Sequence, residues 1–188
     1  MESKTLSEGF QAEFPPGSSV IYAMHGKCNV VSTETRSLGG EAIRFYKLEI
    51  KKSALSRSNK TEPAIWVPIS RAKDQGLRAP MTKEEAEAVL KVLSSREYYF
   101  KANEPWNVIQ PLLEAAIRIE GGLGLAKVAS FLYVMKKKQV VSSPEVNKLQ
   151  ETVHRLLFKE LSEILEETPK NLEQKIIKGF RVKMTPDA

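Results

Sequence analysis

The stretch from Phe14 to Arg78 decides the fold class of this chain, and it opens with FPPGSSVIYAMHGKCNVVSTETR at residues 14–36. Short runs of β-branched and aromatic residues alternate here with glycine and proline turn signals. Gly39-Gly40 marks a tight reversal, because glycine reaches positive φ without steric cost. The runs are residues 20–22, 30–31, 43–50 and 64–69. Four or five short strands this close together predict a small, strongly bent β-barrel of SH3 or Tudor type over residues 14–80.

Two of these runs predict how the sheet meets solvent. Along residues 43–50, Phe45 falls on the opposite side from Tyr46 and Leu48, so the alternation predicts a strand with one wet face. In the run 64–69, Pro68 cannot donate a ladder hydrogen bond, so that strand should end there or lie at an edge. Residues 51–63 predict a long hairpin loop, which we interpret either as a tolerated surface insertion or as a basic finger that touches nucleic acid.

The chain after Pro80 has the periodicity of helices rather than of strands. Thr82 and Glu85 form a capping box that starts a helix over residues 81–95. With 41% hydrophobic residues, a chain of 188 residues can bury one medium core or two small ones. We therefore predict an α+β protein of two domains, in which this helix links the β-barrel to an all-α bundle over residues 96–168.

Three helices are predicted within the bundle, and each has a recognisable start or end. Pro111 should kink the first helix or divide it, because an interior proline removes a hydrogen bond and clashes with the preceding turn. Ser143 and Pro144 start the last helix as its cap and first residue. The three predicted helices are residues 105–120, 123–138 and 144–167. Residues 1–13 and 169–188 are interpreted as tails, of which the second could add a short helix around residues 172–177.

The residue content limits the chemistry. Cys28 is the only cysteine and the two histidines lie far apart in sequence, which excludes an internal disulfide and a multi-cysteine metal site. The chain has no phosphate-cradling glycine loop and no paired catalytic carboxylates with a partner base, so we expect neither an enzyme nor a bound cofactor or metal. It also has no charge-free apolar run long enough to span a bilayer and no apolar signal core. We expect a cytoplasmic monomer.

The charge is mildly basic and unevenly distributed. The formal net charge is +6, which favours an anionic partner but is also a common device for solubility. Residues 1–80 carry 12 basic and 8 acidic side chains, residues 81–141 carry 9 and 7, and residues 142–188 carry 8 and 8. The basic excess therefore lies in the first two thirds of the chain.

Short motifs occur in a fixed order in both halves of the chain. The first half has F-x-x-G-x-x-V-x-Y-x-x-H-G, E-T-R, F-Y-x-L, V-P-I and G-L-R; the second has W-N, A-x-V-x-x-x-L-Y and the run from Ser143 through Ser162. The first set resembles the RNA-polymerase-interacting module of the CarD/CdnL bacterial transcription regulators, which the transcription-repair coupling factor also carries. The second set resembles the helical domain of CarD/CdnL. Together the resemblance covers residues 14–165.

The resemblance implies that the barrel binds the RNA polymerase β subunit and that the helical domain reaches promoter DNA at the upstream edge of the melted region. Arg36 matches an arginine that contacts the β subunit. Trp66 stands at a position that is often basic in the family, and it could anchor an interface or belong to the barrel core. Trp106, followed by Asn107, matches the tryptophan that acts as a wedge in the minor groove. The protein would stabilise the open promoter complex.

One departure from the family pattern weakens the expected contact with DNA. The basic residues that usually follow the Trp-Asn pair are Val108, Ile109, Gln110 and Pro111 here. Fewer phosphate contacts predict weak DNA binding with a shallow dependence on salt. Basic residues that could compensate are Lys101, Arg118, Lys136, Lys137 and Lys138. Trp106 could instead be a packing residue.

Two function classes therefore remain besides the disfavoured enzyme. The protein could be a transcription regulator that contacts both the polymerase and promoter DNA, which would also associate it with the nucleoid. It could instead be a polymerase-docking adaptor whose helical domain binds a protein, as the apolar Val108-Ile109 pair favours.

Overall fold

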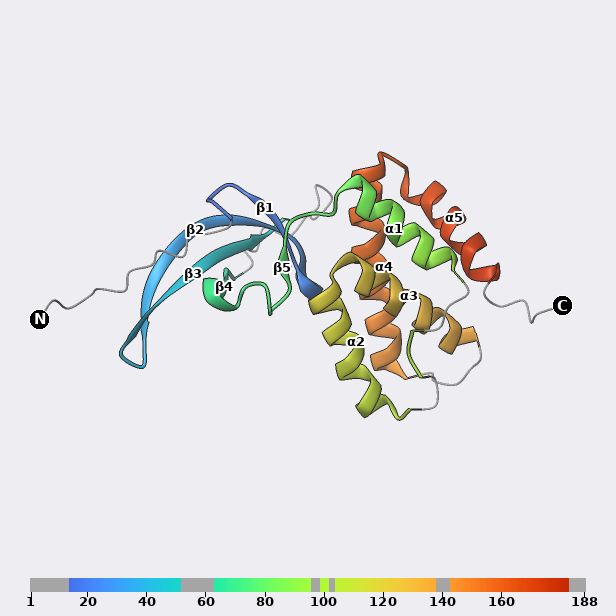
Figure 1. Ribbon diagram of the computed structural model, residues 1–188, viewed down its shortest axis with the longest axis horizontal. Coiled ribbons are helices and arrows are strands. Elements are labelled where there is room, and N and C mark those ends of the chain that lie inside the picture. The colour runs from blue at the N-terminus through green and yellow to red at the C-terminus, as the bar shows by residue number, and fades with distance from the viewer. Residues whose placement is uncertain (1–13, 52–62, 96–98, 102–103, 138–142, 183–188) are drawn as a thin grey trace, which may run out of the picture.

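The computed structural model describes residues 14–51, 63–95, 99–101, 104–137 and 143–182, and side chains within these ranges except those of residues 137 and 179–182. Within these ranges, an antiparallel sheet forms one end of the molecule and five helices form the other (Figure 1). The predicted α+β class, with the sheet before the helices, is confirmed.

The sheet has five strands in the order β4-β3-β2-β1-β5, and one-turn 3-10 helices, η1 (Ala23–His25) and η2 (Ile69–Arg71), follow β1 and β4. The strands are β1 (Ser19–Tyr22), β2 (Gly26–Leu38), β3 (Glu41–Ile50), β4 (Ile65–Pro68) and β5 (Leu77–Arg78). β2 and β3 curve strongly (Figure 1), but the sheet is not closed, because β4 and β5 are its two edges. The predicted barrel closure is therefore not confirmed. The predicted edge position of Pro68 is confirmed.

The long β2–β3 hairpin turns at Gly39-Gly40, as predicted, and both glycines have positive φ. The pairing shifts register between Val30 and Ser32, which marks a β-bulge at Val31. Phe45 corrects the prediction of one wet face, because it is only 9% exposed although it lies opposite the core side of β3. Pro68 of β4 pairs directly with Phe45, so the neighbouring strand covers the ring.

The helices of the described residues are α1 (Lys83–Ser94), α2 (Trp106–Glu120), α3 (Gly122–Lys137), α4 (Pro144–Leu165) and α5 (Pro169–Val182). The first four begin and end close to the predicted positions, whereas α5 is longer than the short helix predicted around residues 172–177. The predicted capping box is present at α1, since the Thr82 hydroxyl accepts from the Glu85 amide at 3.2 Å and the Glu85 carboxylate accepts from the Thr82 amide at 2.8 Å. Ser143 caps α4 by accepting from the Val146 amide at 3.3 Å.

Pro111 lies inside α2, which is one helix from Trp106 to Glu120, so the predicted second start does not occur. The proline removes one hydrogen bond, the one to the Asn107 carbonyl near the start of the helix, and the rest of α2 continues past it. Gly121, with φ of 59°, separates α2 from α3.

Two segments outside the predicted bundle belong to its core. α1 packs on α3, α4 and α5 and buries Ala86, Val89 and Leu93, so it is more than a link between domains. The predicted tail after Thr168 is the helix α5, in which Leu172 and Ile176 are buried. Leu172 and Ile176 are one turn apart and lie on the same side of the helix. This side is buried only because α5 packs against the rest of the bundle.

The buried apolar residues form two clusters. The smaller lies under the sheet and contains Val20, Cys28, Val30, Tyr46, Leu48, Val67, Ala72 and Leu77. The larger fills the helical bundle, and Met24 of η1 packs against it. A residue from the sheet half therefore contributes to the helical core, which ties the two halves together.

Candidate functional site

The outer face of the sheet, on the side away from its core cluster, carries the two residues predicted to bind polymerase. The β2–β3 register pairs Arg36 with Ile43, and the β3–β4 register pairs Lys47 with Trp66 and Phe45 with Pro68. Because partners across an antiparallel pair share a face, these side chains lie on one surface. We call Arg36, Phe45, Lys47, Trp66 and Pro68 the outer sheet patch.

Arg36 and Trp66 are in direct contact within the patch. The guanidinium carbon of Arg36 lies 3.3 Å from the centre of the Trp66 ring, and Lys47 Nζ lies 5.6 Å from it. A second group positions the arginine, since the Glu34 carboxylate lies 3.6 Å from Arg36 Nη2. The Arg36 side chain remains 47% exposed. A partner can therefore reach a guanidinium that is already oriented.

This arrangement suits protein recognition. A guanidinium stacked on an indole gains about 0.5–1 kcal/mol at an exposed site while its N–H donors stay free to pair in the plane of the group. Tryptophan and arginine are also the residues most enriched at interface hot spots. Trp66 is half-buried and is not part of the sheet core cluster, so the geometry fits its interface interpretation.

The residues predicted to bind DNA lie on the helical half. Trp106 is the first residue of α2 and is half-buried, with its ring packed against the bundle core. Its Nε1–H is buried without a hydrogen-bond partner among the described residues. This geometry fits the packing interpretation of Trp106 and leaves its role as a wedge a prediction.

The predicted basic residues are only partly within the described chain. Asn107, Lys101 and Lys136 are exposed, whereas the Lys137 side chain and Lys138 lie outside the described residues. The α2 end that begins at Trp106 and the α3 end that carries Lys136 both point away from the sheet (Figure 1). The Val108-Ile109 pair is divided, because Val108 is exposed and Ile109 is buried in the bundle.

The junction between the sheet and the bundle contains a buried charge pair that the sequence analysis missed. Arg78 of β5 donates two hydrogen bonds to the Glu160 carboxylate of α4, at 2.8 and 2.7 Å. The same carboxylate accepts from the Met81 amide at 2.9 Å, and Glu160 is only 7% exposed. The available signal was a carboxylate between Leu157 and Leu161 on the apolar face of a helix, since a buried charge requires a partner.

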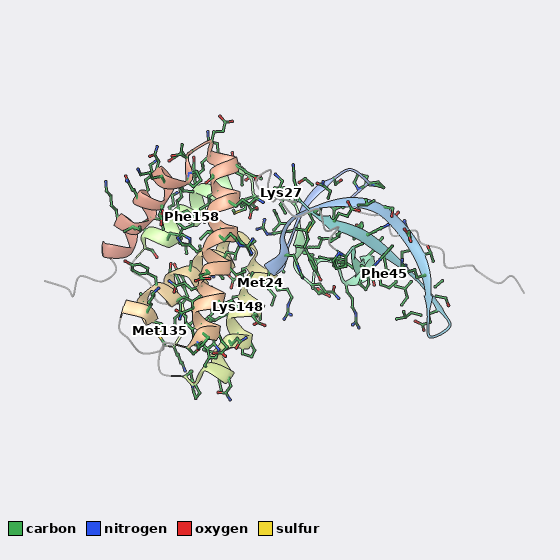
Figure 2. The ribbon with its side chains drawn as sticks, turned by 180° about the vertical axis from the view of Figure 1, so that it is seen from behind. Met24, Lys27, Phe45, Met135, Lys148 and Phe158 are labelled. Carbon is green, nitrogen blue, oxygen red and sulfur yellow. The ribbon has the colours of Figure 1, made fainter. Side chains whose placement is uncertain are left out.

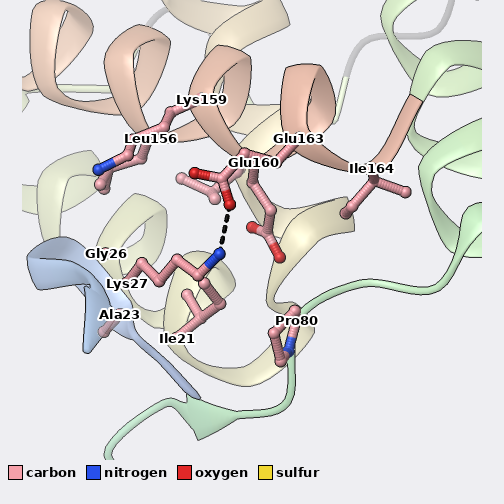
Figure 3. A pocket seen from close by; sticks show the side chains of 11 residues that line it. Ile21, Ala23, Gly26, Lys27, Pro80, Leu156, Lys159, Glu160, Glu163 and Ile164 are labelled. Carbon is pink, nitrogen blue, oxygen red and sulfur yellow. Dashed lines mark hydrogen bonds and ion pairs between the residues drawn. The ribbon is translucent and has the colours of Figure 1, made fainter. Parts of the chain in front are cut away.

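Further contacts hold the sheet against the bundle at this junction. Figure 2 labels Met24 and Lys27 where the sheet meets the bundle. Lys27 forms an ion pair with Glu163 of α4, beside a cavity of about 240 Å³ (Figure 3). Gly26 has φ of 79°, and a Cβ built there would lie 2.6 Å from the Leu156 side chain. The close approach of backbone and helix explains the glycine.

The chain was compared with known proteins. No protein-family model matches it, and no curated protein matches it significantly.

The described residues contain no cluster of three or more histidine, cysteine, aspartate or glutamate residues that could hold a metal ion. No helix within the described ranges combines the length and apolar character required to cross a membrane.

Proposed function

We propose that this protein docks on the RNA polymerase β subunit through its outer sheet patch and regulates transcription. The Arg36–Trp66 stack carries the proposal, because two residues assigned separately to polymerase binding contact each other on an accessible face. In this proposal the curved sheet corresponds to the SH3- or Tudor-like module of CarD/CdnL.

The chemistry of the patch defines what it would bind. Arg36 offers a planar fork for a carboxylate, and the half-buried Trp66 ring offers an apolar surface beside it. Lys47 adds a second positive charge to the same face. The matching surface on the β subunit would therefore present a carboxylate next to apolar side chains.

The bundle would stand beside promoter DNA at the upstream edge of the bubble and stabilise the open complex. The buried Arg78–Glu160 pair supports this arrangement, since it fixes the bundle relative to the docked sheet. An exposed indole at the first turn of α2 would stabilise an unstacked base step only if it bound open DNA better than closed DNA. Trp106 would have to leave its packed position to do so.

The second candidate is a polymerase-docking adaptor whose bundle binds protein. The packed Trp106 ring and the exposure of Val108 and Leu112 on α2 favour this candidate. In both candidates the sheet docks in the same way, and they differ only in what the bundle contacts.

A pull-down with the purified β subunit tests the docking proposal. We expect Arg36→Glu to abolish capture, because it reverses the charge of the proposed anchor, and Trp66→Ala to weaken it by tenfold or more, on the order of 1.4 kcal/mol. Arg44→Glu is the matched control: it makes the same charge change on β3, on the opposite face of the sheet, and should leave capture intact. Full capture by folded Arg36→Glu protein would overturn the proposal.

Footprinting on a polymerase–promoter complex separates the two candidates. Altered reactivity at the upstream edge of the bubble, together with a shorter open-complex lifetime for Trp106→Ala, is expected only if the bundle contacts DNA. An unchanged footprint and lifetime with polymerase still bound would exclude the DNA contact and leave the adaptor.

A further inference from the structure

The outer side of α2 carries an apolar stripe that the described part of the chain leaves exposed. Val108 is 47% exposed, Leu112 54% and Ile119 77%, and the half-buried Ala115 lies between them. Spacings of four, three and four residues place these side chains on one side of the helix. We call Val108, Leu112, Ala115 and Ile119 the α2 stripe.

The bundle does not need this stripe for its own packing. α2 is an outer helix that packs chiefly on α3 (Figure 1), and it uses a different side for that contact. The buried residues of α2 are Ile109, Leu113, Ala116 and Ile117. The helix therefore has one apolar side that faces the core and a second apolar side that is exposed to solvent. Contiguous exposed apolar surface of this kind marks an interaction site.

Two opposite charges border the stripe. Glu114 and Arg118 are both exposed and lie one helical turn apart, on the same flank. The Gln110 side-chain amide donates to Glu114 at 2.9 Å, which orients this carboxylate. The stripe therefore has a negative group and a positive group in fixed order along one edge.

From this pattern we propose that α2 is a homodimer interface, in which the stripe packs against the stripe of a second, antiparallel copy. With a two-fold axis passing between Ala115 and Ala116, Leu112 of each copy faces Ile119 of the other. The small Ala115 lies at the crossing point, where two helices must approach most closely. A two-fold interface requires a surface that is complementary to itself, and this stripe has that property.

The charged flank points to the same register. In the antiparallel pair, Glu114 of each copy lies beside Arg118 of the other. Two Glu114–Arg118 pairs of opposite charge therefore form across the interface. A nucleic acid is a poor match for this surface, because the α2 stripe is apolar and its flank is not uniformly basic. The dimer is independent of the proposed polymerase docking, which uses the opposite half of the molecule.

The expected dimer is weak. Three exposed apolar side chains, one half-buried alanine and one charged flank make a contact smaller than a standard interface, which buries about 1,200–2,000 Å². We therefore expect association in the micromolar range, with dilute protein monomeric and dimers forming only at higher concentration. Sedimentation equilibrium of the full chain over a range of concentrations measures it.

Substitutions in the stripe test the location of the interface. Ile119→Glu and Leu112→Glu should each weaken dimerisation by tenfold or more, because they place a charge in the apolar contact. Leu38→Glu is the matched control: Leu38 is 63% exposed at the tip of the β2–β3 hairpin, and its replacement should leave the dimer intact. A wild-type protein that stays monomeric at every concentration, or a dimer that Ile119→Glu does not weaken, overturns the proposal.

A charge exchange tests the antiparallel register. Glu114→Arg alone and Arg118→Glu alone each create two like-charge contacts across the interface and should weaken the dimer. An equimolar mixture of these two single variants should recover it, because each pair across the heterodimer again joins opposite charges. The double variant E114R/R118E should recover it as well. Failure of both the mixture and the double variant to recover association, with each protein folded, would overturn the proposed register.

A different occupant of the stripe would also be visible. If wild-type protein stayed monomeric while Ile119→Glu abolished binding of a component of the polymerase complex, the second copy would be excluded as the occupant.

Discussion

At the scale of single residues, His154 shows how burial sets the state of a side chain. Its ring lies in the bundle against Phe158, with 3.9 Å between ring centres, at the edge of a cavity of about 180 Å³ between α3, α4 and α5. Burial lowers the pKa of His154, and the Glu173 carboxylate on α5 partly opposes this effect. Other titratable groups that line the cavities around the imidazole are Tyr133, Lys136 and Glu151.

The lowered pKa of His154 predicts a loss of stability in mild acid. The unfolded chain binds a proton near the ordinary value of 6.5, whereas the folded chain resists protonation at that pH. The stabilising contribution is therefore present above pH 6.5 and declines as the pH falls below it. His154→Gln should reduce the difference in unfolding free energy between about pH 7.5 and about pH 5.5, measured by urea denaturation. His25→Gln, at the exposed histidine, is the matched control, and equal pH dependence in wild type and His154→Gln would contradict the prediction.

At the scale of elements, α5 shows that local signals are insufficient to place a helix. Thr168 caps it by accepting from the Asn171 amide at 3.3 Å, and this signal is local. The helix is nevertheless held by its packing on α1 and α4, where Leu172 is completely buried. An isolated helix of this length is marginal in water, so tertiary burial supplies its stability.

Leu172→Ala should therefore destabilise the whole bundle rather than a tail. Removing a fully buried leucine side chain costs about 2–5 kcal/mol, through lost burial and the cavity that remains. Urea denaturation measures the loss. Leu38→Ala, at an exposed leucine, should change the unfolding free energy by less than about 0.5 kcal/mol. A loss for Leu172→Ala as small as that control would show that α5 contributes little to the bundle.

At the scale of the whole molecule, the junction decides whether the sheet and the bundle behave as one body. Arg78 and Glu160 lie far apart in the chain, yet they form a buried bidentate pair at the point where the two halves meet. Met24 of η1 packs against the helical core where the sheet meets the bundle (Figure 2). This junction fixes the position of the bundle relative to the sheet.

Glu160→Ala should loosen this junction. It leaves the Arg78 guanidinium without its carboxylate and the Met81 amide without its acceptor, a change that costs about 3–5 kcal/mol for a buried pair. Small-angle scattering should show a broader distribution of distances between sheet and bundle. Glu163→Ala removes the more exposed ion pair with Lys27 from the same helix and should cost less than about 1 kcal/mol. Indistinguishable scattering and stability for both variants would exclude this role of Glu160.

Much of the fold followed from residues that are close in sequence. The turn at Gly39-Gly40, the capping box at Thr82 and the cap at Ser143 were predicted because each depends on contacts within a few residues. That the sheet stays open instead of closing into a barrel, and that α1 belongs to the bundle, was not predicted. Strand pairing and helix packing depend on which distant segments meet, and a local pattern does not contain that information.

The sequence by itself determined most of the strands and the helices α1 to α4, with their turns and caps, and which residue types are available for recognition. Only the tertiary structure decided that Arg36 stacks on Trp66, that Arg78 meets Glu160, and that α2 leaves a second apolar side in solvent. The physical reason is the range of the interactions involved. Propensity and capping act within one or two turns, whereas a shared surface depends on the register and packing of elements that are distant in the chain.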